Sequence, residues 1–159
     1  MSKKVQRVQN VAALKKTLLR LKKRGKKIVF TNGCFDLLHP GHIKIFKEAK
    51  AKGDVLVVGI NSDASVRRIK GKTRPVLDQW ARAQNVSSLR PVDYVVLFEE
   101  ETPYELMKEL KPDYLVKGGD WKKKDIVGRD LVKKVFRVNV LRKYSTSRMI
   151  KKILRGAPR

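Results

Sequence analysis

The stretch "KIVFTNGCFDLLHPGHIKIF" (residues 27–46) joins a short apolar run to a loop and to the start of a helical pattern. The run lacks strict alternation, which is typical of a strand buried on both faces of a parallel sheet. Gly33 begins the loop, and both histidines of the chain, His39 and His42, flank Pro40-Gly41 at its end. Ligands of open α/β sheets bind beyond the carboxyl ends of the strands. The stretch therefore predicts a ligand-binding loop directly after the first strand.

The same succession of a strand and a helix repeats along the chain. Short Val-rich runs predict strands at 27–32, 54–61, 93–98, 113–118 and 135–141. Helical spacing or helix-start residues occur at 41–53, 62–71, 77–89, 102–111 and 145–156. Such alternation is typical of α/β domains with right-handed crossovers. We therefore expect an α/β fold, with a Rossmann-like doubly wound parallel sheet of about five strands.

The first 26 residues predict a basic amphipathic helix. Lysines and arginines separate apolar residues at helical spacing, and a glycine ends the pattern: Val8, Val11, Leu14, Leu18, Leu21 and Gly25. The apolar stripe either covers the body of the protein or forms part of a homodimer interface. We expect the main domain at 27–154 and a basic tail at 155–159.

Charge is unevenly distributed along the chain. The 159 residues carry 39 Lys+Arg and 15 Asp+Glu, a formal net charge of +24, yet every carboxylate side chain lies between Asp36 and Asp130. The basic ends suit an RNA, an anionic surface or an acidic partner. A lysine-rich, solvated surface explains them better, because aromatic residues for base stacking are not interleaved with the basic ones.

Length and apolar content favour one domain in the cytoplasm. The chain is long enough for one hydrophobic core and has no apolar run of membrane-spanning length. Its first ten residues lack the apolar segment of a secretory signal, and the single cysteine, Cys34, allows no internal disulfide. We therefore expect a cytoplasmic protein.

The two histidines suit the binding of an anion. Gly33 and Gly41 let the backbone approach a ligand, and a helix that begins near Gly41 offers free N–H groups at its positive dipole end. His39 and His42 then donate to the same anion. A zinc site is a weaker alternative, since two histidines and the nearby Cys34 are too few ligands for closed coordination. A packing or capping role is the other alternative, and the position after the first strand favours function.

Two segments resemble the signatures of the cytidylyltransferase-like nucleotidyltransferases, "GCFDLLHPGH" (33–42) and "YSTSRMIKKI" (144–153). The first contains Gly-x-Phe-Asp followed by His-x-Gly-His, and the second resembles the hydroxyl-rich helix start of that superfamily. Three further segments, 58–76, 92–103 and 112–121, resemble the adenylyltransferase domain of ADP-heptose synthases in residues and in order. The resemblance covers most of the chain and implies a fold of the His-x-Gly-His nucleotidyltransferase type.

This resemblance implies a reaction and a set of partners. ATP and a heptose 1-phosphate would give ADP-heptose and pyrophosphate, a step toward the lipopolysaccharide core. Mg²⁺ would accompany ATP, and a sugar kinase on a separate chain would be a partner. A cytidylyltransferase of the glycerol-phosphate type and an FAD synthetase are the sibling alternatives. A third alternative is a non-enzymatic module that binds RNA or a membrane through the basic ends.

The resemblance and the expected fold together assign site residues. Catalytic contacts to the reacting phosphates are implied for His39, His42, Lys117 and Arg148. Binding of ATP is implied for Asn32, Gly33, Cys34, Phe35, Asp36, Gly41, Gly119, Asp120, Ser145, Thr146 and Ser147. Binding of the substrate phosphate is expected for Asn61, Asp63, Lys70, Arg74 and Arg82. The metal ligands are left unassigned, because Asp36 alone is thin support for a protein-held Mg²⁺.

Some positions have a structural alternative or depart from the family pattern. For Asp63 a cap of the following helix is slightly favoured over ligand binding, and Ser145 suits both a cap and a phosphate contact. Trp80 stands two residues before Arg82, where the family usually has an acid, and Ser147 replaces a threonine. The first departure puts a local ion pair or ribose contact in doubt, whereas the second retains the hydroxyl.

Overall fold

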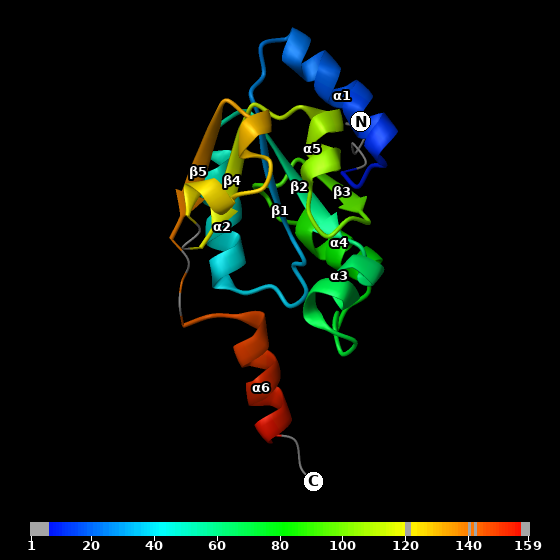
Figure 1. Cartoon of the computed structure of the whole chain (residues 1–159), viewed down its shortest axis with the longest axis vertical. Helices are drawn as coiled ribbons and strands as arrows, with labels where there is room; N and C mark the ends of the chain where they lie inside the picture. The colour runs from blue at the N-terminus through cyan, green and yellow to red at the C-terminus, as the bar shows by residue number, and fades with distance from the viewer. Residues whose placement is uncertain (1–6, 120–121, 140, 142, 157–159) are drawn as a thin grey trace.

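The fold is a parallel sheet covered by helices. The computed structural model describes residues 7–119, 122–139, 141 and 143–156. The five parallel strands are ordered β3-β2-β1-β4-β5 (Figure 1) and comprise β1 (Ile28–Gly33), β2 (Val55–Asn61), β3 (Tyr94–Phe98), β4 (Tyr114–Gly118) and β5 (Lys134–Val138). The expected α/β fold with a parallel five-stranded sheet is thus confirmed.

The strand limits agree with the sequence to within one residue, except at the end of β5. The sequence predicts this strand to residue 141, but it ends at Val138. The carbonyl oxygen of Asn139 accepts a hydrogen bond from Lys44 Nζ at 2.9 Å. Beyond Val138 the backbone therefore bonds to a lysine side chain.

Strand β1 lies in the middle of the sheet, between β2 and β4. Ile28 is opposite Val55 of β2, and Val29 is opposite Tyr114 of β4. The chain adds β2 and β3 on one side of β1 and then crosses to add β4 and β5 on the other. This reversal creates a switch point between β1 and β4, which is where open α/β sheets bind ligands.

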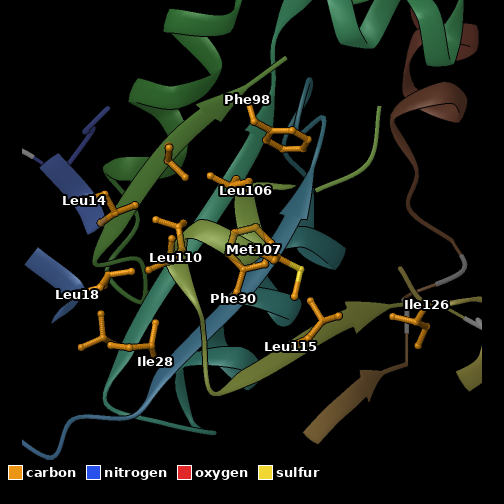
Figure 2. Close-up of a cluster of buried hydrophobic side chains, with 13 residues drawn as sticks. Leu14, Leu18, Ile28, Phe30, Phe98, Leu106, Met107, Leu110, Leu115 and Ile126 are labelled. Carbon is orange, nitrogen blue, oxygen red and sulfur yellow. The ribbon is translucent and has the colours of Figure 1, made fainter. Parts of the chain in front are cut away.

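Helices cover both faces of the sheet and bury two apolar clusters. The helices are α1 (Val11–Lys23), α2 (Pro40–Lys50), α3 (Asp63–Lys70), α4 (Gln79–Ser87), α5 (Tyr104–Leu110) and α6 (Thr146–Gly156), and two short 3-10 turns, η1 (Lys123–Asp125) and η2 (Arg129–Leu131), precede β5. Helices α1 and α5 supply the first cluster, where Phe30 of β1 lies among Leu106 and Met107 (Figure 2). Helices α2 and α4 supply the second cluster, on the opposite face.

Helix α1 covers the body of the protein, and it begins later than the apolar spacing predicts. Val8 is not helical: it forms a parallel bridge with Val95 of β3. The side chain of Asn10 then caps α1 by accepting from the backbone N–H of Ala13. Leu14 and Leu18 are buried in the first cluster. The apolar stripe is therefore used within the chain, and a homodimer stays a prediction.

Helix α6 projects away from the body (Figure 1). None of its residues is buried, and the side chains of Ile153 and Leu154 are 63% and 69% exposed. Among the described residues, no helix is long and apolar enough to cross a membrane. The division of the chain into 1–26, 27–154 and 155–159 stays a prediction.

Candidate active site at the switch point

A cavity of about 500 Å³ lies at the carboxyl ends of the central strands, and we call it the switch-point cavity. Its walls come from β1 and the following loop, from β4, from the segment after β2 and from the start of α6. Most of the site residues expected from the sequence line it: Asn32, Gly33, Cys34, Phe35, Asp36, His39, His42, Asn61, Lys70, Arg74, Lys117, Ser145, Thr146 and Ser147. The fold therefore brings together segments that are far apart in the sequence.

His39 caps the helix that His42 belongs to. Its Nδ1 accepts a hydrogen bond from the backbone N–H of Gly41 at 3.1 Å. Because an accepting Nδ1 carries no proton, neutral His39 carries its proton on Nε2 and can donate it to a ligand. A Cβ at position 41 would lie 2.9 Å from the His39 ring. Gly41 therefore permits this cap, and it does not itself line the cavity.

The two imidazoles stack on each other, with ring centres 3.8 Å apart. Phe35 packs edge-on against His42 at 5.3 Å. Burial lowers the pKa of His42 to about 4, with a further contribution from His39, and burial also lowers the pKa of His39. The buried Nδ1 of His42 has no partner among the described residues. The pair is therefore neutral at pH 7 and retains hydrogen-bonding capacity for a ligand.

Lys117 reaches the cavity from β4, beside the loop that joins β1 to α2 (residues 34–39), which we call the histidine loop. Its Nζ donates to Asn32 Oδ1 at 2.6 Å. Burial lowers the pKa of Lys117 to about 8. The backbone N–H of Gly119 bonds to Val138 O at 3.1 Å, and Asp120 lies outside the described residues. The cavity thus has a half-buried cation whose charge an incoming anion would stabilise.

Asp36 is committed to the protein. Its carboxylate accepts from Arg74 Nε at 2.8 Å and from the backbone N–H groups of Val76 and Leu77 at 2.8–3.0 Å. Burial by itself raises the pKa of Asp36, but the hydrogen bonds from Leu77 and Val76, together with Arg74, outweigh it and lower the pKa. Asp36 therefore fixes the segment 74–77 beside the cavity, and its carboxylate has little capacity left for a metal.

Arg82 and Asp63, both expected to bind the substrate phosphate, pair with each other. Arg82 is fully buried, and its guanidinium donates to Asp63 Oδ1 at 2.7 Å. It also donates to the carbonyl oxygens of Cys34 and Leu77 at 2.6 and 3.0 Å. Neither Arg82 nor Asp63 lines the switch-point cavity. In this geometry the pair braces the histidine loop, and Ser62 provides the cap of α3.

Two predicted polar residues lie at the margins of the cavity. Asn61 is buried and donates to Ser65 Oγ at 3.0 Å and to Glu100 O at 3.3 Å. Lys70 is exposed at the end of α3. Asn61 therefore organises the wall, whereas Lys70 is accessible to a ligand.

The start of α6 forms the hydroxyl-bearing wall. Thr146 Oγ1 donates to Leu37 O at 3.1 Å, which joins α6 to the histidine loop. Ser145 Oγ accepts from the backbone N–H of Arg148 at 3.2 Å, so Ser145 also caps the helix. The side chain of Arg148 is exposed and does not line the cavity.

Trp80, which stands where the family usually has an acid, lies in the first turn of α4, and Asp78 precedes that helix. Asp78 caps α4 by accepting from the backbone N–H groups of Trp80 and Ala81. The side chain of Trp80 is 64% exposed and lies outside the switch-point cavity. The absence of an acid at position 80 therefore leaves Arg82 with Asp63 as its acidic partner.

Sequence reasoning missed one acidic wall residue. Glu101 lines the cavity from the segment after β3, together with the apolar Ile45 and Ile69. A run of three glutamates at 99–101, directly after a predicted strand, was the available signal. It is inconspicuous because charged residues are common after strands.

Volume alone does not identify this site. An apolar groove of about 880 Å³ runs beside α2 and includes Leu38, Ile43 and Leu89. His39 is the sole predicted site residue among its described lining residues. The switch-point cavity is smaller but contains the donors and cations that phosphate binding needs.

Comparisons with known proteins agree with this geometry. HldE of Wolinella succinogenes, described as a bifunctional protein, is 53% identical over 148 residues, which are 93% of this chain and 31% of that protein. HldE of Campylobacter jejuni serotype O:2 is 50% identical over 151 residues, 95% of this chain and 33% of that one. The chain thus spans about a third of the length of these curated relatives.

Solved structures give the same fold. The lipopolysaccharide core biosynthesis protein of Thermoplasma volcanium has a TM-score of 0.63 and 34% identity, covering 76% of this chain and all of that one. Pantoate-beta-alanine ligase of Francisella tularensis, at 20% identity and a TM-score of 0.63 over 96% of this chain and 80% of that one, shares the fold. The cytidylyltransferase-like family model matches residues 30–153, which include both histidines and most of α6. Because this match covers most of the chain, the protein belongs to the cytidylyltransferase-like family.

Proposed function

We propose that the protein transfers AMP from ATP to a heptose 1-phosphate and releases pyrophosphate. The observation that carries this proposal is the neutral, stacked pair of His39 and His42 in one cavity with the hydroxyl-bearing start of α6. The resemblance of 58–76, 92–103 and 112–121 to ADP-heptose synthases supports the sugar substrate. So does the likeness to HldE proteins and to a lipopolysaccharide core biosynthesis protein.

The chemistry requires positioning more than proton transfer. A sugar phosphate is ionised at neutral pH, so its oxygen attacks the α-phosphorus of ATP without a base. The bond from the α-phosphorus to the bridging oxygen breaks, and pyrophosphate leaves with that oxygen. His39 and His42 donate hydrogen bonds to the charge that develops on the phosphoryl oxygens. Lys117 holds the attacking phosphate beside them.

The triphosphate is proposed to extend from the histidines to α6. The free backbone N–H groups at a helix start, with the positive dipole end, bind phosphates. Ser145, Thr146 and Ser147 add hydroxyls there, and Lys70 and Arg74 bring positive charge from the end of α3 and the segment that follows it. Arg148, in the first turn of α6, is proposed to contact the departing phosphates.

Mg²⁺ is proposed to enter bound to the phosphate oxygens of ATP. Asp36 does not suit a protein-held Mg²⁺, because Arg74 and two backbone N–H groups already occupy its carboxylate. The metal shields the triphosphate charge when bound. The contacts proposed above between protein groups and the substrate phosphates do not involve the metal.

The remaining expectations belong to this proposal. A sugar kinase would supply the heptose 1-phosphate in the cytoplasm. A homodimer, and binding of the basic ends to RNA or an anionic surface, stay predictions.

The test is pyrophosphate release by the purified protein with Mg²⁺. ATP or CTP is offered with heptose 1-phosphates of both anomers, glycerol 3-phosphate or FMN. We expect release with ATP plus a heptose 1-phosphate. Release with CTP and glycerol 3-phosphate, or with ATP and FMN, would replace the proposed substrates while retaining the mechanism. No release with any pair would contradict the enzymatic proposal and lead to tests of RNA and vesicle binding.

A further inference from the structure

A second cavity, of about 160 Å³, adjoins the switch-point cavity, and we call it the side cavity. The two share Asn32, Glu101 and Lys117 as wall residues. The side cavity adds Thr102 and Pro103 from the segment before α5, and Asp125, Ile126 and Val127 from the segment after β4. Its position next to Lys117 places it beyond the proposed attacking phosphate.

The two cavities differ in the sign of their charge. Three cations, Lys70, Arg74 and Lys117, and two carboxylates, Asp36 and Glu101, line the switch-point cavity, so its lining side chains leave an excess of positive charge that favours an anion. In the side cavity Lys117 is the one cation among the described lining residues, and two carboxylates, Glu101 and Asp125, line it as well. A phosphate there would be repelled. Hydroxyl groups, in contrast, donate short charge-assisted hydrogen bonds to carboxylates.

The segment that carries Glu101 is tied to α3. The carbonyl oxygen of the preceding Glu100 accepts from Ser65 Oγ at 2.8 Å and from Asn61 Nδ2 at 3.3 Å. The Glu101 carboxylate lies 3.5 Å from Arg68 Nε in an exposed ion pair. An exposed pair of this kind is weak, at about 0.2–1 kcal/mol, so it orients the carboxylate while leaving it available to a ligand.

The segment that carries Asp125 is anchored to the first apolar cluster. Ile126 is 4% exposed and belongs to that cluster (Figure 2). A side chain at Gly128 would collide with Met107, which shows how closely this turn packs on α5. Tyr104 Oη donates to Asp130 Oδ2 at 2.8 Å and joins the same segment to α5 again. The carboxylate at 125 therefore sits on a well-held turn.

Size and apolar lining limit the ligand further. Pockets for drug-sized molecules have volumes of roughly 300–1,000 Å³, and the side cavity has about 160 Å³. This volume suits one small ring and not the tricyclic system of a flavin. Pro103, Ile126 and Val127 supply an apolar wall for the C–H groups of such a ring.

We propose that the side cavity binds the polyhydroxylated ring of the acceptor, with Glu101 and Asp125 as the hydrogen-bond acceptors that select a sugar. This inference rests on the proposed function, because it places the acceptor phosphate at Lys117. The acceptor then lies with its phosphate towards the histidines and its hydroxyls towards the two carboxylates. Glycerol 3-phosphate, which has only two free hydroxyls and no ring, leaves this cavity largely unused.

The experiment compares Glu101→Gln and Asp125→Asn with the unaltered protein. Both changes remove charge and retain shape. Because hydrogen bonds to charged groups exceed neutral ones by about 1 kcal/mol, each change should raise the KM and the Kd of heptose 1-phosphate about five- to tenfold. The KM of ATP, and inhibition by inorganic phosphate, should stay within about twofold. The double variant should lose more than either single one.

Glu105→Gln is the matched control, since this exposed glutamate of α5 pairs with Lys108 and lines neither cavity. It should leave the sugar affinity unchanged. Glu101→Gln also removes the ion pair with Arg68, whereas Asp125→Asn does not. A loss of sugar affinity in Asp125→Asn therefore cannot come from breaking that pair.

The outcomes distinguish the two proposals. If the unaltered protein releases no pyrophosphate with any heptose 1-phosphate and calorimetry detects no binding, both fail. If it turns over but Glu101→Gln and Asp125→Asn behave like Glu105→Gln, the side cavity is overturned and the proposed function stands. If the variants weaken ATP and the sugar phosphate equally, the carboxylates stabilise the whole site and do not select the sugar.

Discussion

Two groups of side chains at the carboxyl edge of the sheet are held in opposite ways. In the first, which we call the ion-pair frame, Asp36 pairs with Arg74 and Asp63 pairs with Arg82. Each charge of the frame is paired with the opposite charge, and Asp36 and Arg82 also form hydrogen bonds with the backbone. The frame therefore contributes to folding, and Asp63 and Arg82 lie outside the switch-point cavity, whereas Arg74 also lines it.

The second group, the open set, consists of His39, His42 and Lys117. Burial lowers the pKa of all three, so their charged forms are disfavoured until an anion arrives. Such groups make folding less favourable than a fully paired wall would, and they are typical of functional sites. The comparison predicts that changes in the frame cost stability, whereas changes in the open set cost activity.

The largest effect on stability is expected from Arg82→Met. The change leaves Asp63 and the carbonyl oxygens of Cys34 and Leu77 without their donor. Breaking a buried pair costs about 3–5 kcal/mol, and we expect about 3 kcal/mol because the Asp63 side chain is 23% exposed. Urea unfolding measures this loss. Arg67→Met, at an exposed position of α3, is the control and should change stability by less than about 0.5 kcal/mol.

A loss of less than about 1 kcal/mol for Arg82→Met would mean that water replaces the lost donor, and the frame would then not be structural. A folded variant that binds neither substrate would instead return Arg82 to the ligand site.

His42→Ala tests the open set. Losing one preorganised donor to a transition state typically lowers turnover about 10²–10³-fold, or about 3–4 kcal/mol. We expect that loss in kcat for pyrophosphate release, with a melting temperature close to that of the unaltered protein. Lys47→Ala, at an exposed position further along the same helix, should change neither quantity. Full activity in the His42 variant would break the comparison, because an open group would then have no catalytic use.

The sequence was sufficient for the central strand, the loop and the helix that follow one another in residues 27–46. The apolar runs predicted the strands because each strand is one continuous segment of mostly buried residues, which is visible in the local sequence. The local pattern failed at Val8, whose helical spacing with Val11 was overridden by pairing with Val95. Pairing with a strand almost ninety residues away leaves no signal in a local pattern.

The site was predicted only in part, for a related reason. His39 and His42 follow β1, and Lys117 lies near the carboxyl end of β4, so topology alone brings them to the switch point. The partners of Asp63 and Arg82 depend on distances in space between residues 19 positions apart in the chain. In a sequence, an arginine paired to an aspartate and an arginine awaiting a phosphate look the same.

Asp36→Asn should weaken the frame without removing its shape. The amide cannot accept as strongly from Arg74 or from the backbone N–H groups of Val76 and Leu77. Hydrogen bonds to a charged group contribute about 1.5–3 kcal/mol, so we expect the free energy of unfolding to fall by about 2 kcal/mol. The KM of ATP should rise several-fold as the loop around Arg74 loosens. An unchanged stability with a lost Mg²⁺ dependence would show that Asp36 is a metal ligand after all.

The protonation of Lys117 gives a smaller, pH-dependent effect. The profile of kcat/KM reports groups of the free enzyme, so it should fall above pH 8, about tenfold per pH unit, as Lys117 loses its proton. His42, with a pKa of about 4, stays neutral throughout that range. Lys117→Arg retains the cation and should keep the profile flat. A fall that persists in this variant would assign the titration to another group.

The same lysine makes an opposite prediction for stability. Its pKa is lower in the folded protein, about 8, than its usual value of 10.5. Between these values the unfolded chain binds more protons, so this group makes the free energy of unfolding rise with pH. Activity and stability should therefore diverge above pH 8 in the unaltered protein, and less so in Lys117→Arg.

Thr146→Val should have the smallest effect, and it tests a wall that belongs to neither group. The change preserves shape but removes the hydrogen bond to Leu37 O, which contributes about 0.5–1.5 kcal/mol. No residue of α6 is buried, so apolar packing does little to hold the helix. This hydrogen bond therefore contributes much of the attachment between the helix start and the histidine loop. We expect the Kd of an ATP analogue to rise about threefold with little change in melting temperature. A fall in melting temperature with unchanged affinity would place α6 in the folded frame, whereas the expected result would mean that the ligand itself holds the helix in position.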